Sequence, residues 1–226
     1  MQSTIKVMLV VLLIMAATGC AASRDILDIK NNASVNPVEG KAIKFVRVSD
    51  NRDFQIEPRQ ADIPSLKNSE IHDAEITSRA IARKRDAHGM AWGDILLPEG
   101  KTVKGVVKNR LSEGFRASNY RVLSVEDEGY EQAIPVDIDI EKFWGWVSPG
   151  FWSIGLNFQT SIIVSAPTGI FSEGLKFDSE VQKRYQTGVI GNWEAVIELS
   201  LAELREDIKT KIQPTHVSKN SRQSDD

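Results

Sequence analysis

Three acidic residues, Asp137, Asp139 and Glu141, alternate with apolar residues within the segment 134–146. On one face of a β-strand they would stand about 6 to 7 Å apart at successive positions, because a strand rises roughly 3.3 Å per residue. This separation is in the range of the acid and base pair of glycosidases. The same pattern is also typical of the solvated face of a half-buried strand, which is far more common. We therefore expect a structural role for these residues, and an enzyme that uses this acidic face is the alternative.

Other residues that could support catalysis are scarce in the sequence. The histidines, His72, His88 and His216, offer no pair at a spacing that suits zinc. The sequence contains neither a Gly-x-Ser-x-Gly nucleophile elbow nor a glycine-rich phosphate loop. We expect no catalytic set, no metal and no cofactor, so the sequence predicts a protein that is not an enzyme.

Large aromatic residues gather around a predicted turn at residues 148–150, and they form the predicted partner-binding site. These residues are Phe143, Trp144, Trp146, Phe151 and Trp152. Within one strand Trp144 and Trp146 share a face and Phe143 takes the other, so at least one large ring should lie on the polar side. Exposed aromatic rings mark partner surfaces, sugar-stacking platforms or membrane interfaces. Packing of the same rings in the core remains the alternative.

The single cysteine, Cys20, follows an unbroken apolar run over residues 7–17. This run is too short to span a bilayer, which takes about 20 residues, but it suits the apolar region of a secretory signal peptide. It ends in Ala17-Thr18-Gly19-Cys20, which resembles the bacterial lipobox. The resemblance implies cleavage before Cys20 and acylation of that cysteine with fatty acids such as palmitate. Because Ala21 rather than Asp follows, it also implies the periplasmic face of the outer membrane. A plain signal peptide is the alternative.

The composition is typical of a globular protein and does not favour nucleic-acid binding. The 226 residues carry a net charge of −3 and are 41% hydrophobic, which excludes disorder of the whole chain and argues against a nucleic-acid partner. The sequence predicts a lipoprotein signal peptide at 1–19, a lipidated tether at 20–38, a single periplasmic domain at 39–213 and a disordered tail at 214–226.

The elements that would position these residues are predicted from periodicity. Apolar residues recur at helical spacing over 103–115 and over 193–212, and they alternate in three runs over 134–146, 154–164 and 171–185. Three alternating runs with short connections predict an antiparallel meander, and the helical stripes need a sheet face to cover. We expect an α+β fold with a mainly antiparallel sheet, a three-strand C-terminal meander and two helices packed on one face.

The order of these features resembles the YajG-like uncharacterised lipoproteins of Gram-negative bacteria. The matching motifs are the lipobox at Cys20, Asp50-Asn51-Arg52 after an early strand, the segment 83–91, and the aromatic segment 143–152. The resemblance covers most of the chain from Cys20 to residue 212 and brings no catalytic residues. It implies a non-enzymatic binding or accessory subunit of the cell envelope, held in the membrane by its lipid, with an unidentified envelope protein or glycan as partner.

Overall fold

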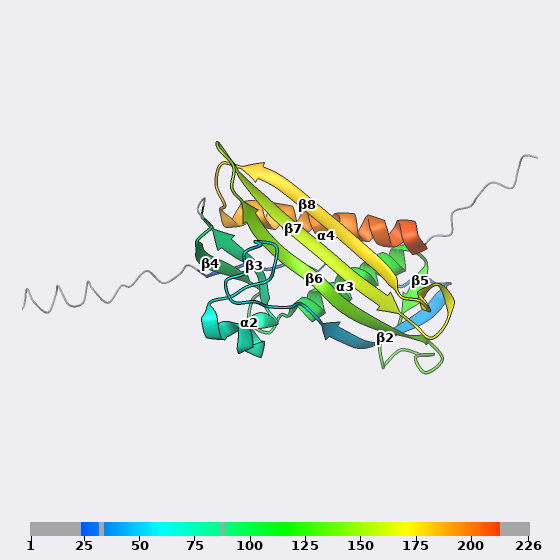
Figure 1. Cartoon of the computed structure of the whole chain (residues 1–226). Helices are drawn as coiled ribbons and strands as arrows, with labels where there is room; N and C mark the ends of the chain where they lie inside the picture. The colour runs from blue at the N-terminus through cyan, green and yellow to red at the C-terminus, as the bar shows by residue number, and fades with distance from the viewer. Residues whose placement is uncertain (1–23, 32–33, 87–88, 213–226) are drawn as a thin grey trace, which may run out of the picture.

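The longest strand, β6 (Ile134–Ser148), lies at the centre of an eight-stranded sheet in the computed structural model, which describes residues 24–31, 34–86 and 89–212 (Figure 1). Cys20 and the predicted tail at 214–226 fall outside the described residues. The other strands are β1 (Asp25–Ile26), β2 (Lys41–Asp50), β3 (Ala80–Arg85), β4 (Ala91–Leu96), β5 (Tyr120–Val122), β7 (Ile154–Ser165) and β8 (Leu175–Tyr185).

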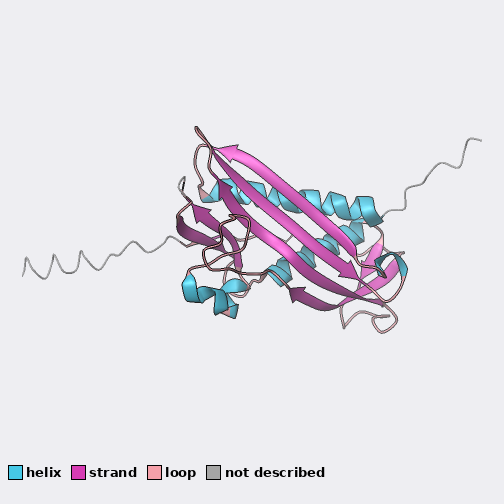
Figure 2. Ribbon diagram, in the orientation of Figure 1, coloured by secondary structure: helices cyan, strands magenta, loops and turns pink. Residues whose placement is uncertain are grey.

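Two long helices, α3 (Val103–Ala117) and α4 (Ile190–Ile212), cover one face of this sheet (Figure 2). Their apolar stripes are buried against the strands, and Phe115 and Trp193 are completely enclosed. The helices expected at these positions are therefore confirmed. None of the helices in the described part of the chain is long and apolar enough to cross a membrane.

The expectation of a mainly antiparallel sheet is wrong, because the sheet is mixed. β6, β7 and β8 do pair antiparallel in chain order, as the alternating runs predict. However, β2 and β3 both lie parallel to β6, β5 lies parallel to β2, and β1 lies parallel to β4. Among the described strands only β3 and β4 add a further antiparallel pair. Alternation fixes which side chains share a face but not which strand becomes the neighbour, so the direction of pairing was not encoded in the pattern.

A β-bulge in β6 reverses the faces that its side chains occupy. The pairing with β7 runs through Ile140 and resumes at Lys142, so that Glu141 has no partner in the register. Before the bulge the even-numbered residues face the helices, and after it Phe143 and Val147 do so. An extra residue inserted in one strand has this effect because side chains alternate with a period of two. The bulge therefore turns Trp144 to the opposite face of the sheet.

A second, smaller core covers Trp144 on that opposite face. Buried Leu66, Ala80 and Leu96 surround Trp144, and Phe54 meets its ring edge-to-face at a centroid distance of 5.7 Å. The segment 51–79, which contains a 3₁₀ turn, η1 (Asn68–His72), and the short helix α2 (Ala74–Thr77), supplies much of this cover. The described chain thus has a third helix beyond the two expected.

The described part of the predicted tether is packed against the sheet rather than free. β1 adds to the edge of β4, and Leu27 and Ile29 are 4% and 1% exposed in the main core. Further along, the Asn36 side chain both accepts from the backbone N–H of Val122 and donates to its carbonyl. The expectation of a free tether is therefore wrong for the described residues from Arg24 onward, because Leu27 and Ile29 anchor this segment in the core.

Candidate functional site

The structure separates the five aromatic residues of the predicted partner-binding site. Phe143 and Trp144 are completely buried on opposite faces of the sheet, so neither can contact a partner. Trp146 is half-buried beside the smaller core, with the Lys142 ammonium 5.8 Å from its ring centroid. Phe151 and Trp152 are 89% and 82% exposed. The prediction is thus wrong for the first two residues, and the last two form the accessible surface.

Phe151 and Trp152 lie at the tip of the turn between β6 and β7. Their rings pack edge-to-face, with centroids 4.8 Å apart at 90°. The turn before them is tight, because a Cβ atom added to Gly150 would stand 2.3 Å from the carbonyl oxygen of Ser153. The tip therefore presents a paired aromatic surface on a short connection between two long paired strands, and such surfaces are typical of contact sites.

Other exposed residues at this end of the sheet escaped the sequence analysis. Met90 ends the turn from β3 to β4 and Trp92 lies near the start of β4; they are 69% and 46% exposed. The exposed Val189 and Ile190 stand where the connection from β8 meets the start of α4. β3 runs parallel to β6, and β8 ends opposite the start of β7, so all three connections lie at the same end. We call Met90, Trp92, Phe151, Trp152, Val189 and Ile190 the aromatic end. The sequence carries no signal that distinguishes these exposed residues from the buried aromatic residues.

The three carboxylates of the acidic strand face are held by a neighbouring arginine and asparagine. Arg47 of β2 donates to Asp137 and to Asp139, each at 3.1 Å, and Asn51 donates to Asp139 and Glu141 at 3.4 and 3.3 Å. The hydrogen bond and charge of Asp137, followed by the charge of Asp139, raise the pKa of Arg47. Two ion pairs from Arg47 and two hydrogen bonds from Asn51 thus hold this strand face, in line with the structural interpretation of the pattern.

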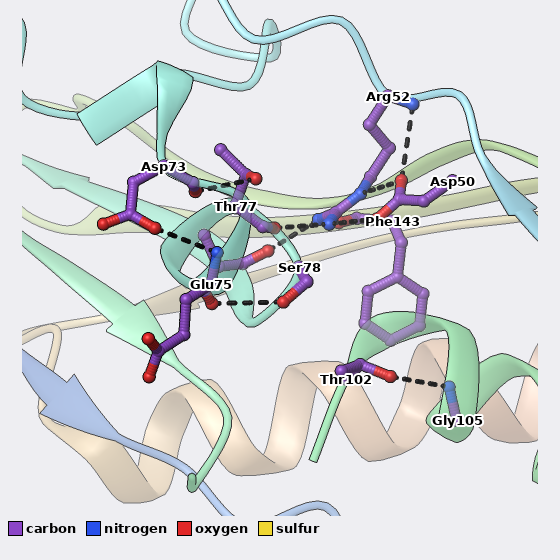
Figure 3. A network of polar contacts seen from close by, with 10 residues as sticks. Asp50, Arg52, Asp73, Glu75, Thr77, Ser78, Thr102, Gly105 and Phe143 are labelled. Atoms are coloured by element: carbon purple, nitrogen blue, oxygen red, sulfur yellow. Dashed lines mark hydrogen bonds and ion pairs between the residues drawn. The ribbon is translucent and has the colours of Figure 1, made fainter. Parts of the chain in front are cut away.

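Asp50 and Arg52 of the Asp50-Asn51-Arg52 motif form a largely buried polar network (Figure 3). The Arg52 side chain has no exposed surface, and it pairs with Asp50 while donating to backbone carbonyls of Thr77, Ala80 and Phe143. Nearby, Asp73 caps α2 by accepting from the backbone N–H of Glu75. This network fixes the segment 51–79 over the smaller core and leaves Arg52 no donor for a ligand.

Two surface pockets of about 540 Å³ each contain polar side chains that are already bonded. In the pocket between α3 and the residues after β5, the Arg116 guanidinium donates to Ser34 and Asn36. In the pocket beside β3, Arg85 donates to the carbonyl of Gly89 and the hydroxyl of Ser65. Burial, and then the neighbouring Arg83, lower the pKa of Arg85. These arrangements stabilise loops.

The expected absence of a catalytic set and of a metal site remains a prediction. His72 is exposed at the end of η1, and His88 and His216 lie outside the described residues. Within residues 24–31, 34–86 and 89–212 no group of three histidine, cysteine or acidic side chains is placed to hold a metal ion.

Comparison with known proteins finds similar solved structures, among them two without a described activity. No protein-family model and no curated protein matches the sequence. One solved structure, of an uncharacterised protein, is 8% identical and covers 76% of this chain and 100% of its own, with a TM-score of 0.42. Protein XCC0632 from Xanthomonas campestris, a member of the family DUF330, is 10% identical and covers 83% of this chain and 94% of its own, with a TM-score of 0.44. Both neighbours are uncharacterised proteins.

Proposed function

We propose that the chain is a YajG-like lipoprotein, anchored by acylated Cys20 at the periplasmic face of the outer membrane, that acts as a non-enzymatic binding or accessory subunit of the envelope. The observation that carries this proposal is the lipobox together with the short stretch of chain between Cys20 and the first contacts of the described residues. Arg24, four positions after Cys20, already pairs with Glu70 and Asp94. Four residues span at most about 14 Å, so an anchor at Cys20 would hold the domain next to the bilayer.

The geometry of the acidic face supports a non-enzymatic role. A glycosidase needs one protonated and one free carboxylate on either side of a substrate bond, whereas Arg47 lies between Asp137 and Asp139 and binds both. The Asp137 and Asp139 side chains are 39% and 22% exposed on this face of β6. The alternative is an enzyme that acts on cell-wall glycan or envelope lipid.

Two measurements test the anchor and the location. Cells that express the full chain are labelled with radioactive palmitate, and their membranes are separated on a density gradient. We expect label on the wild-type protein, its loss from Cys20→Ser, and recovery of the wild-type protein with the outer membrane. An unlabelled wild-type protein would contradict the proposed anchor, and label in the inner-membrane fraction would contradict the location.

Two further measurements test the binding role. Cross-linking in whole membranes followed by purification and mass spectrometry is expected to recover a specific envelope component with the wild-type protein. The purified protein is also incubated with peptidoglycan and phospholipid. Turnover that disappears in Asp139→Asn would replace the binding role by the enzymatic alternative.

A further inference from the structure

The exposed tryptophan and phenylalanine side chains of the described chain all belong to one end of the sheet. Trp92, Phe151 and Trp152 lie there, together with Met90, whereas the exposed hydrophobic residues elsewhere are single valines and isoleucines. The paired Phe151 and Trp152 are the most exposed of this group, at the tip of their turn. A surface rich in exposed tryptophan and phenylalanine favours an apolar or interfacial partner over water.

The first described residues point toward this same end. β1 lies parallel to β4, with Asp25 opposite Ile95 and Ile26 opposite Leu96, so the step from Ile26 back to Arg24 runs in the direction of Trp92 and the aromatic end, and Arg24 pairs with Asp94. A direct chain of contacts joins the two: Asp25 accepts from the Lys84 ammonium at 2.8 Å, and that ammonium lies 4.3 Å from the centroid of the Trp92 ring. In Figure 1 β3 and β4 lie on the left, while the red end of α4 lies on the right.

Basic side chains accompany the aromatic residues. Lys183 and Arg184 are exposed among the last residues of the strand β8. β8 ends opposite the start of β7, next to the tip. The Arg184 guanidinium passes directly beside Gly150, since a Cβ atom there would be 3.0 Å from Nη1. Aromatic rings flanked by lysine and arginine are the combination that binds the headgroup region of an anionic bilayer.

We propose that the aromatic end lies on the bilayer surface, with Phe151 and Trp152 in the headgroup region and Lys183 and Arg184 against anionic phosphates. The inference rests on the proposed lipid anchor, because an acyl group within about 14 Å of Arg24 brings this end of the domain, rather than the end of α4, to the membrane. The lipid alone leaves the domain free to rotate, and the aromatic end fixes its orientation.

The test uses a property of the sequence: Cys20 is the single cysteine, and acylation would consume it. A cysteine introduced into the lipidated full-length mature protein is then the only free thiol. Met90→Cys reports on the aromatic end, and Ile170→Cys, in the turn between β7 and β8 at the opposite end, is the matched control; these positions are 69% and 53% exposed. Each protein is labelled with a fluorophore and reconstituted in phosphatidylethanolamine and phosphatidylglycerol vesicles that contain a spin-labelled quencher lipid.

We expect the quencher lipid to reduce fluorescence several-fold more at position 90 than at position 170. We also expect Phe151→Ser with Trp152→Ser to abolish most of that difference. Equal quenching at the two positions, or quenching at position 90 that the double substitution leaves unchanged, overturns the proposal. A third outcome also overturns it: the double variant no longer cross-links to a protein that the wild type captures, while its quenching is unchanged. That outcome assigns the aromatic end to a protein partner. The mass of the purified protein reports acylation separately, and an unacylated wild-type protein overturns the anchor and this inference together.

Discussion

The Arg52 guanidinium and the Asp50 carboxylate form a bidentate ion pair, with Nε to Oδ1 and Nη2 to Oδ2 distances of 2.7 Å. The remaining donors of Arg52 reach carbonyl oxygens of Thr77, Ala80 and Phe143, at 2.8, 2.6 and 3.3 Å. One side chain thereby connects the end of α2, the start of β3 and the middle of β6. The motif that carries part of the family resemblance is therefore structural in this chain, because it holds the cover of the smaller core in place.

Removal of this arginine should be strongly destabilising. Arg52→Met leaves the partly buried Asp50 carboxylate without its cation and removes a donor from three carbonyls, and breaking a buried pair in this way costs about 3–5 kcal/mol. Arg52→Lys should also destabilise, because an ammonium cannot reproduce the bidentate geometry. The control is Arg47→Met, whose ion pairs are solvent-exposed and should contribute far less to stability. Urea unfolding measures the difference, and equal losses for Arg52→Met and Arg47→Met would refute the structural assignment.

Gly145 is required where β6 passes beneath α4. A Cβ atom at this position would stand 2.8 Å from the Trp193 ring and 3.1 Å from side-chain atoms of Ala82 and Phe158. Gly145→Ala should therefore cost about 1–3 kcal/mol through overpacking. Gly105→Ala is the control, because its Cβ would have 3.6 Å to the nearest atom and alanine favours the helix by up to about 1 kcal/mol. Thermal unfolding should show a lower midpoint for the first variant only; a lowered midpoint for both would contradict this packing.

The long elements could be predicted from periodicity, because their burial extends over many residues. α3 and α4 follow the apolar stripes of 103–115 and 193–212, and the three alternating runs became β6, β7 and β8. These segments depend on one-sided burial, which a sequence pattern records directly.

The side of the sheet on which each aromatic residue lies could not be predicted, because one residue decides it. The bulge at Glu141 has no sequence signature, yet it moves Trp144 from the helix-covered face to the face beneath Phe54. The parallel partners β2 and β3 were equally hidden, since they depend on long crossovers rather than on alternation. The sequence therefore places the aromatic residues around the turn between β6 and β7, but it does not tell which of them are exposed.

Asp127 should make the free energy of unfolding depend on pH. Hydrogen bonds from the backbone N–H and the hydroxyl of Ser124, at 2.7 and 2.8 Å, lower the pKa of Asp127 below its usual value. A carboxyl group whose pKa is lower in the folded state stabilises the fold above its unfolded pKa, and this contribution is lost as the pH falls through the folded pKa. Asp127→Asn should therefore be less stable than wild type at pH 7, and the difference should shrink as the pH falls from the ordinary pKa of 3.8 through the lower folded pKa.

The matched control for this pH dependence is Glu126→Gln, because Glu126 is its exposed neighbour in the same turn. The free energy of unfolding is measured against pH for the three proteins. A difference between Asp127→Asn and wild type that stays constant down to low pH would show that the carboxylate charge is not the cause.

Trp144 and Trp152 provide the sharpest test of the division between core and surface. Trp144 has no exposed surface and packs against Phe54, whereas Trp152 is 82% exposed at the tip. Trp144→Ala should cost about 3–5 kcal/mol, because it leaves a large cavity in the smaller core, and Trp152→Ala should change stability by no more than about 0.5 kcal/mol. The indole N–H of Trp144 is buried without a hydrogen-bond partner among the described residues, so Trp144→Phe should cost much less than Trp144→Ala. Chemical unfolding of the three variants measures these differences, and a large loss on Trp152→Ala would mean that the tip is packed and not available to a membrane or a partner.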